Sequence, residues 1–516
     1  MCFNYFLSSP VEQGVVCVLI IFYPAPLDKA LYVVHSDGES DEDIAYMQKM
    51  RYTDGDPDHA DSDKTFTVEE AVDCIGLGCF QWRIFIVSGL ITAADALEML
   101  LLAVLSPVLR CSFGLTDFQV ALITTVVFCG MGTFAPIWGI VGDKIGRKST
   151  LVNVTLCIGY FGLLTAASPN YIWILILRGM VGVGMGGSPQ GFTLLAEYLP
   201  SKNRAKVLIF SQIFWAAGSM FEILLAALVI PTIGWRWLLA FSAIPVLTVV
   251  PLLWFIPESA RYLVATGQYD KALRNLNYAA KVNKSKLPEG RLVKSQVQTE
   301  TGRVRDLFSR EYLRSTLQLW MLWFGTAFAY YGMVLASAEI LRVENEKNSH
   351  SCKCNYLTSE DYKTMIISTL GEFICLPVNM LLIDCIGRRL TGSLNLAGTG
   401  IFFLLLQLSV PRWLLTTFMF AVRGFSSATF NWIYIYSSEV YPTSVRTVGM
   451  GMASAWARVG AMITPFVAQV VLAASVTAAT WVYGLICLSC AAVAFFLPIE
   501  TKGRPMPQTV VYDSFQ

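Results

Sequence analysis

The chain has little charge for its length. Asp, Glu, Lys and Arg make up 15% of its 516 residues, whereas roughly a quarter is usual in soluble domains. An ordinary soluble protein is therefore excluded. A disordered chain is excluded as well, because the net charge is only +1 and aromatic residues reach 13%. The same small net charge gives no basic field that would indicate nucleic acid as a partner.

Histidine is also scarce, with three in the whole chain. No Cys/His spacing typical of a metal site occurs, and no nucleophile and base recur with a spacing suited to catalysis. We therefore expect no metal, no other cofactor and no enzymatic activity.

Apolar sequence, in contrast, is abundant at 55% of the chain. About 20 apolar residues are enough to cross a bilayer once, and runs of about that length recur between charged or Pro/Gly segments. The predicted fold class is an all-α membrane protein with twelve transmembrane helices, embedded in the lipid bilayer. The predicted spans are residues 83–108, 118–141, 150–168, 172–195, 206–230, 237–256, 315–340, 362–383, 391–409, 413–436, 448–472 and 476–497.

Lys and Arg orient these spans. If the N-terminus is cytoplasmic, the connections on its side carry roughly three times as many of them as the other side, as the positive-inside rule requires. Both termini are therefore expected in the cytoplasm. The expected organisation is a tail at 1–80 that is acidic over 35–73, a half at 81–256, a linker at 257–314, a second half at 315–497 and a tail at 498–516.

Short sequence motifs, called words below, recur in both halves in the same order. The matched pairs are Asp143 with Asp384, Arg178 with Arg423, Glu197 with Glu439 and Arg204 with Arg446, at offsets of 241 to 245 residues. Pro257–Arg261 closes the first half, and Pro498–Gly503 closes the second. A shared composition would not place these words in order, so the sequence predicts two six-helix halves related by a parallel repeat, an architecture found among transporters.

Taken together, the words over residues 80–504 resemble the sugar-porter and organic-ion branch of the major facilitator superfamily. Val68–Trp82, Ala94–Met99 and Ala457–Phe466 narrow the resemblance to its synaptic vesicle 2-related group. The resemblance implies alternating-access transport of a small organic solute in a synaptic or other cytoplasmic vesicle membrane, or in the plasma membrane. It also allows a vesicle membrane protein that keeps the fold but acts as a regulatory or nucleotide-binding partner.

The repeated loop words predict a cytoplasmic gate. We expect ion pairs there when the halves close, with Arg147 and Arg204 as candidate partners of Glu197, and Arg388, Arg389 and Arg446 as those of Glu439. Each exposed pair contributes roughly 1 kcal/mol or less, so several must act together. The alternative is that these cations only fix the topology. The predicted gate residues are Asp143, Gly146, Arg147, Lys148, Glu197, Arg204, Asp384, Gly387, Arg388, Arg389, Glu439 and Arg446.

Charged side chains inside spans are costly, at about 2.5 to 3.5 kcal/mol each at the centre, so each needs a partner or a role. Asp95 and Glu98 lie three residues apart and hence on one helical face. Two ionised carboxylates would repel, which favours protonation of one. They are therefore candidates for proton coupling or cation binding; alternatively they pair with Arg178 and hold two spans together. The predicted pathway residues are Asp95, Glu98, Arg178, Glu222, Glu372, Arg423, Arg458, Tyr330 and Tyr331.

Arg458 bears on the substrate. Its A-R-V-G word resembles the eleventh span of organic anion transporters, where this position is basic, and a guanidinium is suited to hold a carboxylate. An anionic solute is one prediction. The other is that Arg458 only neutralises Glu372, since the charges inside the spans are mostly acidic. Trp215, Tyr330 and Tyr331 are candidates to stack on a ring-shaped ligand, although packing is the commoner fate of aromatic residues in spans.

Two features lie outside the spans. Cys111, Cys352 and Cys354 are predicted on the outer side, where a disulfide is possible. Tyr512–Phe515 has the form of an adaptor sorting signal, so a cytoplasmic adaptor that binds the C-terminal tail is a candidate partner.

Overall fold

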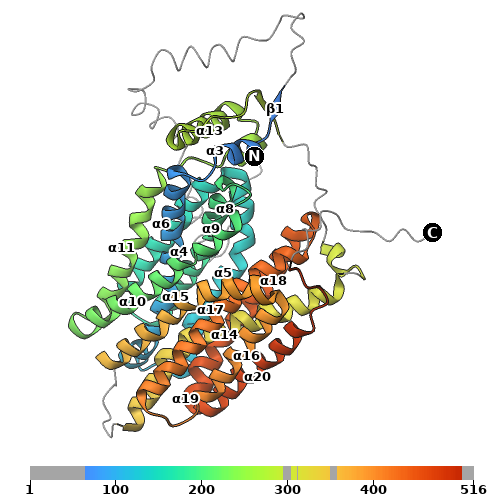
Figure 1. Cartoon of the computed structure of the whole chain (residues 1–516). Coiled ribbons are helices and arrows are strands. Elements are labelled where there is room, and N and C mark those ends of the chain that lie inside the picture. The colour runs from blue at the N-terminus through green and yellow to red at the C-terminus, as the bar shows by residue number, and fades with distance from the viewer. Residues whose placement is uncertain (1–63, 295–303, 311, 349–356, 503–516) are drawn as a thin grey trace, which may run out of the picture. The chain divides into compact units, whose positions relative to one another are not determined.

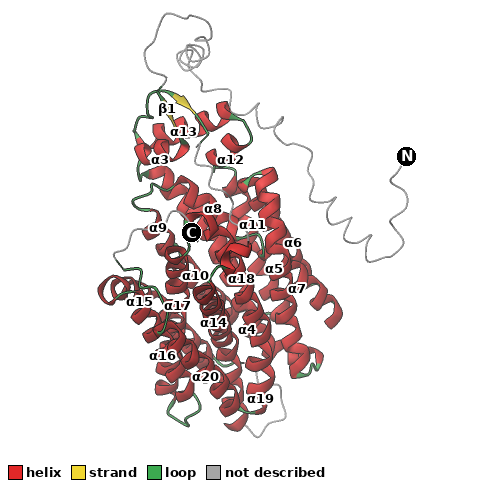
Figure 2. Ribbon diagram, turned by 90° about the vertical axis from the view of Figure 1, so that its right-hand side faces the viewer, coloured by secondary structure: helices red, strands yellow, loops and turns green. Residues whose placement is uncertain are grey.

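The computed structural model describes residues 64–294, 304–310, 312–348 and 357–502, and these are largely helical (Figures 1 and 2). The chain separates into two compact units, Met1–Thr65 and Phe66–Gln516, and all of the described helices belong to the second. Three predicted features lie outside the described residues: the acidic segment up to Asp63, the cysteines Cys352 and Cys354, and Tyr512–Phe515.

The first half of the repeat contains six helical spans, two of which are broken. They are α4 (Cys79–Phe113), α5 (Asp117–Ile145), α6 (Arg147–Ala166), α7 (Tyr171–Met185) with α8 (Pro189–Tyr198), α9 (Arg204–Phe210) with α10 (Ile213–Thr232), and α11 (Trp235–Leu253). The fourth span breaks between Met185 and Pro189, since a proline has no N–H for the helical ladder and is favoured at a helix start. A Cβ at Gly182 would lie 2.2 Å from the carbonyl oxygen of Val127, so glycine lets α7 approach α5 closely.

The second half repeats this pattern. Its elements are α14 (Leu313–Asn348), α15 (Ser359–Ile386), α16 (Arg388–Leu405), α17 (Arg412–Val440), α18 (Thr443–Pro465) continued by the π-helical η4 (Phe466–Val471) and α19 (Leu472–Ala474), and α20 (Val476–Phe495). Within the described residues, 10 helices are long and apolar enough to cross a membrane. The ninth and tenth predicted spans, α16 and α17, are more polar because of arginine, serine and asparagine side chains. They pack against each other, and α16 packs against α20.

The helix pairs show the repeat in three dimensions. In the first half α4 packs on α10, α5 on α7, and α6 on α11; in the second, α14 packs on α18, α15 on α17, and α16 on α20. The halves meet through α4 with α14, α5 with α18, and α10 with α15. Because the same three helix pairings occur in both halves, the predicted two-half architecture is present.

The expected tail and linker contribute ordered elements at one end of the bundle. These are α3 (Val68–Ile75), α12 (Ala260–Ala265), α13 (Tyr269–Asn283), the strands β1 (Thr65–Phe66) and β2 (Arg291–Leu292), and η3 (Val304–Phe308). The backbone N–H of Val293 donates to the carbonyl of Phe66 beside the strands. We call α3, α12 and α13 the cap, the bundle end that they cover the cap end, and the opposite one the distal end.

An apolar core fixes the cap to the bundle. Thr67 and Glu70 form a capping box at the start of α3. Val72 of α3 and Leu276 of α13 are buried in one cluster with Phe80 of α4. Both α3 and α4 pack against α13, and α3 and α13 lie beyond the start of α4 (Figure 1). The cap is thus held where the first span begins.

Candidate functional site

At the cap end, the loop words of the first half form an ion-pair network. Arg147 Nη1 lies 2.5 Å from Asp143 Oδ1, and its Nε lies 3.6 Å from Glu197 Oε1. The Ser259 hydroxyl donates to Glu197 Oε2. This network joins the ends of α5 and α8, the start of α6 and the cap.

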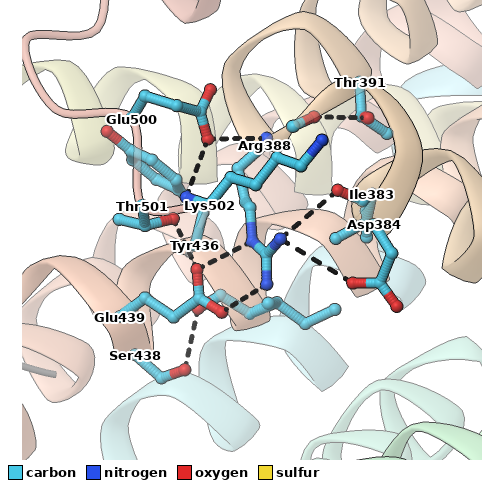
Figure 3. A network of polar contacts seen from close by, with 12 residues as sticks. Ile383, Asp384, Arg388, Thr391, Tyr436, Ser438, Glu439, Glu500, Thr501 and Lys502 are labelled. Carbon is cyan, nitrogen blue, oxygen red and sulfur yellow. Dashed lines mark hydrogen bonds and ion pairs between the residues drawn. The ribbon is translucent and has the colours of Figure 1, made fainter. Parts of the chain in front are cut away.

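The second half forms a matching network (Figure 3). Arg388 donates to both oxygens of Glu439 at 3.0 Å each, and its Nη1 lies 3.7 Å from Asp384 Oδ1. Thr501 donates to Glu439 Oε2 at 2.5 Å, as Ser259 does to Glu197 in the first half. The bidentate geometry makes Arg388 the better-held arginine of the two.

Two further carboxylates cap helices in these networks. Glu258 Oε1 accepts the backbone N–H of Lys148 at 3.0 Å, at the start of α6. Glu500 accepts the N–H group of Arg388 at 2.9 Å (Figure 3) and that of Arg389 at 3.0 Å, at the start of α16. Partial burial opposes ionisation of Glu500, but these backbone hydrogen bonds outweigh it and lower the pKa of the carboxyl. We did not predict these roles, although both residues stand in the repeated words at an offset of 242.

The loop glycines allow this capping. Gly146 and Gly387 have φ of 99° and 91°, a region that favours glycine. A Cβ at Gly146 would also lie 2.2 Å from Glu258 Oε2. Glycine is therefore required where each loop enters its helix.

Three predicted gate arginines bind carbonyl oxygens rather than the glutamates expected for them. Arg204 donates to the Leu199 carbonyl and Arg446 to the Tyr441 carbonyl. Arg389 donates to the Phe495 carbonyl at 2.6 Å. The expectation of direct pairs with Glu197 and Glu439 is wrong for these three, because each guanidinium lies next to a helix end whose carbonyls lack intrahelical partners.

A buried ion pair lies within the first half. Arg178 Nη1 of α7 lies 2.8 Å from Glu98 Oε2 of α4, and each side chain is 2% exposed. Arg178 Nε also donates to Thr165 Oγ1 at 3.3 Å. A small cavity of about 10 Å³ adjoins Arg178, with Ser106 and Trp235 in its lining. The predicted alternative, a pair that joins the first and fourth spans, is the observed arrangement for Glu98.

Two other acidic groups surround this pair. Glu222 of α10 is fully buried, accepts hydrogen bonds from Ser242 at 3.0 and 3.1 Å, and interacts electrostatically with both members of the pair. Asp95 is partly exposed and accepts from Ser188 at 2.8 Å. Asp95 and Glu98 therefore have separate partners. The hydroxyl partners were not predicted, since single serines in a span carry no distinguishing sequence signal.

The second half has its own buried pair, at Arg423. Arg423 Nε of α17 lies 2.5 Å from Glu372 Oε1 of α15. The Tyr330 hydroxyl of α14 donates to the same oxygen at 3.0 Å, and the Trp215 indole of α10 donates to Tyr330. Because Trp215 belongs to the first half, a hydrogen-bonded chain crosses from one half to the other in the middle of the bundle.

Arg458 also lies where the halves meet. Its Nη1 contacts the sulfur of Met131 on α5, and it interacts electrostatically with Asp95 and Tyr331. The alternative in which Arg458 neutralises Glu372 is wrong, because Arg423 occupies that carboxylate. Phe128 packs on Tyr331 with ring centroids 4.9 Å apart.

The distal end joins the halves by polar and aromatic contacts. Arg110 of α4 lies 2.9 Å from Glu339 of α14, and Gln469 of η4 donates to Ser106 at 2.7 Å. Phe118 packs against Phe466 with ring centroids 5.6 Å apart. These contacts close the distal end between the halves.

Two predictions concern cysteines and metals. Cys111 takes part in a disulfide bond, as the expected outer location allows. Within the residues that the structure describes, no group of three or more His, Cys, Asp or Glu side chains is arranged to hold a metal ion.

Two repeated helical halves, buried charges at their centre and loop networks at one end define the class of multi-pass membrane transporters. The family model described as "Sugar (and other) transporter" matches residues 71–510. The chain belongs to this family, whose members embed in the membrane and take small solutes.

Individual relatives of the chain support the same family. The chain is 45% identical over 458 residues to synaptic vesicle 2-related protein of Xenopus laevis, covering 87% of this chain and 83% of the relative. It is 44% identical over 462 residues to the Homo sapiens protein SVOPL, covering 86% and 94%. The predicted resemblance to the synaptic vesicle 2-related group is confirmed.

Solved structures agree on the fold. The inward-open xylose transporter XylE from E. coli superposes with a TM-score of 0.65 at 16% identity, covering 83% of this chain and 98% of that one. A D-xylose-proton symporter superposes with a TM-score of 0.64 at 17% identity, covering 82% and 99%. The predicted all-α fold of two six-helix halves is confirmed.

Proposed function

We propose that the chain moves a small organic anion across a vesicle membrane by alternating access, coupled to protons, with the cap and both termini in the cytoplasm. The observation that carries this proposal is the Glu98–Arg178 pair, in which both side chains are 2% exposed. A pair so deeply buried is costly to ionise and costly to break, so it needs a role beyond packing.

Protonation of Glu98 would weaken its ion pair with Arg178. Neutral Glu98 attracts Arg178 far less, and an unpaired buried guanidinium must find another partner. Glu222 interacts electrostatically with Arg178 and is therefore the carboxylate that the released guanidinium would attract. Exchange of one partner for the other would alter how α4, α7 and α10 pack. Proton binding at Glu98 thereby favours one arrangement of the first half over the other.

Arg458 would couple the solute to the proton. Its guanidinium attracts Asp95 in the present arrangement. A solute carboxylate would compete with Asp95 for Arg458, and protonation of Asp95 would remove that competition. Anion binding and proton uptake therefore favour each other. Tyr331, which also interacts with Arg458, is placed to contact the same solute.

Closure at the distal end supports assignment of this arrangement to the inward-facing state. Arg110, Glu339, Ser106 and Gln469 join the halves there, and the fold superposes on an inward-open neighbour. The Arg147 and Arg388 networks each lie within one half and are formed in this arrangement. They would bias the exchange between states by fixing the helix ends of each half at the cap end.

Location and partners extend the same proposal. The names of the relatives support a synaptic or other cytoplasmic vesicle membrane, and the cation-rich loops support cytoplasmic termini. The buried charges serve transport in this proposal, which includes no enzymatic step. An adaptor that binds Tyr512–Phe515 would set the compartment and leave transport unchanged.

Uptake into proteoliposomes tests the function. Purified chain is reconstituted and offered a panel of small organic anions and cations, with and without a pH gradient. We expect at least one anion to accumulate several-fold more with the gradient, Asp95→Asn to reduce the effect of the gradient, and Arg458→Ala to weaken uptake of anions. If no solute moves, and Asp95→Asn and Arg458→Ala alter no ligand-induced thermal shift, transport by this site is refuted.

A further inference from the structure

The outward face of α13 carries cations that solute transport does not use. Arg274, Lys281 and Lys284 are exposed, and their spacing of seven and three residues places them along one side of α13 and its C-terminal end. The opposite side, with Leu276, is buried against the cap core. Residues 271–288 contain five basic and no acidic side chains. One face of the cap is therefore strongly positive.

These cations have no protein partners within the described part of the chain. No ion pair and no side-chain hydrogen bond there involves Arg274, Lys281, Lys284 or Lys286, whereas Arg261 of α12 pairs with Glu69 of α3 at 3.1 Å. Cations that serve the cap fold would be expected to have such partners. The unpaired face is free to bind an external anion.

The face lies at the level where α4 enters the membrane. Arg83 Nη1 of α4 donates to the hydroxyl of Tyr278 on α13 at 3.2 Å. Next to Arg83, Trp82 is 45% exposed, and Ile86 one turn later is 50% exposed. An exposed tryptophan followed by an exposed aliphatic residue is typical of the boundary between lipid headgroups and acyl chains. Tyr278 and the cations beside it therefore lie near the headgroups.

We propose that Arg83, Arg274, Lys281 and Lys284 form a binding surface for the headgroups of anionic phospholipids in the leaflet next to the cap. A lipid phosphate combines negative charge with acceptor oxygens, which suits lysine and arginine. Juxtamembrane cations of this kind gain from the negative surface potential of the leaflet. This inference does not depend on the proposed solute or on proton coupling.

Lipid bound here would also act on the first span. Asn283 at the end of α13 accepts the backbone N–H of Phe80 at 3.0 Å and donates to Gln81 at 2.7 Å. These contacts fix the end of α13 to the first turn of α4. A lipid that holds α13 at the membrane surface therefore also stabilises the start of the helix that carries Asp95 and Glu98.

Lipid titration of the full-length chain tests the surface. The purified chain in neutral detergent receives phosphatidylserine or phosphatidylcholine of the same acyl length, and bound lipid is counted by native mass spectrometry alongside the thermal midpoint. The test variant is Arg274→Gln/Lys281→Gln. The matched control is Lys202→Gln/Lys206→Gln, which removes the same charge from exposed positions between α8 and α10.

We expect phosphatidylserine to bind and raise the midpoint more than phosphatidylcholine. Its apparent affinity should fall roughly tenfold or more in the test variant and less than about twofold in the control, and should weaken as salt rises. The midpoint without added lipid should match wild type in both variants, because these side chains have no ion pair or side-chain hydrogen bond among the residues that the structure describes. The proposal is overturned if the two lipids bind with the same affinity, or if both variants lose the same affinity for phosphatidylserine. It is also overturned if soluble glycerophosphoserine binds as tightly as the lipid.

Discussion

The two halves of the repeat are alike at the cap end and different in the middle. At the cap end, Arg147 and Arg388 both meet a glutamate that also accepts from a hydroxyl. In the middle, the equivalent arginines Arg178 and Arg423 are each 2% exposed. Arg178 takes its glutamate from the first span, whereas Arg423 takes Glu372 from the eighth.

The fold requires the matched contacts at the cap end but not the buried pairs in the middle. Repeated helix ends need the same caps in both halves, so matched networks follow from the fold alone. The buried pairs have no such requirement. The first half has the additional carboxylate of Glu222 near its arginine, and the second has a tyrosine that links the halves. One arrangement suits partner exchange, and the other suits contact between halves.

The largest expected effect comes from removal of the buried arginines. Arg178→Gln should cost about 3 to 5 kcal/mol, because Glu98 is left buried without its cation. Arg423→Gln should cost less, since Tyr330 still donates to Glu372. Thermal unfolding of the purified chain in detergent measures both. Addition of Glu98→Gln to Arg178→Gln should recover part of the loss; equal losses for the two arginine variants, or no recovery, would refute the asymmetry.

At the cap end, the two arginines should differ by their geometry. Arg388→Gln removes two hydrogen bonds to Glu439 at 3.0 Å each and should cost about 1.5 to 3 kcal/mol. Arg147→Gln removes a looser contact of 3.6 Å to Glu197 and a contact of 2.5 Å to the exposed Asp143, and should cost about 1 kcal/mol or less. The same unfolding assay compares them, with Lys206→Gln as an exposed control. A larger loss for Arg147→Gln would contradict the geometry.

The contact between halves predicts a smaller effect. Trp215→Phe keeps the ring but removes the donor to Tyr330 and should cost about 1 kcal/mol. Trp254→Phe, at a position 60% exposed, is the matched control and should leave the midpoint unchanged. If both tryptophan variants behave alike, the bond between Trp215 and Tyr330 contributes nothing to stability.

The smallest effect is a pH dependence at Glu500, whose backbone hydrogen bonds lower the pKa. A carboxyl with a lowered folded-state pKa stabilises above its ordinary pKa, and this contribution is lost as pH falls through the lowered value. The thermal midpoint of the wild type should therefore fall further between about pH 5 and pH 3 than the midpoint of Glu500→Gln. Glu289→Gln, at an exposed position, should follow wild type. Parallel curves for wild type and Glu500→Gln would contradict the assignment.

Much of the fold was predictable because apolar length and repeated words report it directly. The sequence predicts unbroken spans across Pro136 and Pro377, and α5 and α15 are continuous there. The helices α3, α12 and α13 are not among the predicted elements, since short amphipathic helices outside the membrane leave only a weak signal in the sequence. The break at Gly186–Ser188 is also absent from the expected spans, although Pro189 marks it in the sequence.

The candidate site was predictable in its charged residues and not in their partners. A charge in an apolar span is visible in sequence, which singled out Glu98, Arg178, Glu372 and Arg423. Which carboxylate meets which arginine depends on helix rotation and on contacts between spans. For that reason the sequence offers Glu372 as a partner for Arg458, whereas the structure pairs Glu372 with Arg423.

Proton movement that accompanies solute uptake tests the central claim most directly. Proteoliposomes that contain a trapped pH indicator are given a transported anion, and wild type is compared with Glu98→Gln, which keeps the shape and an acceptor for Arg178. We predict that wild type couples solute entry to proton entry, and that Glu98→Gln moves fewer protons per solute, because only Asp95 can still take up a proton in that variant. Proton movement in Glu98→Gln equal to that of wild type would contradict the claim that the Glu98–Arg178 pair carries the proton.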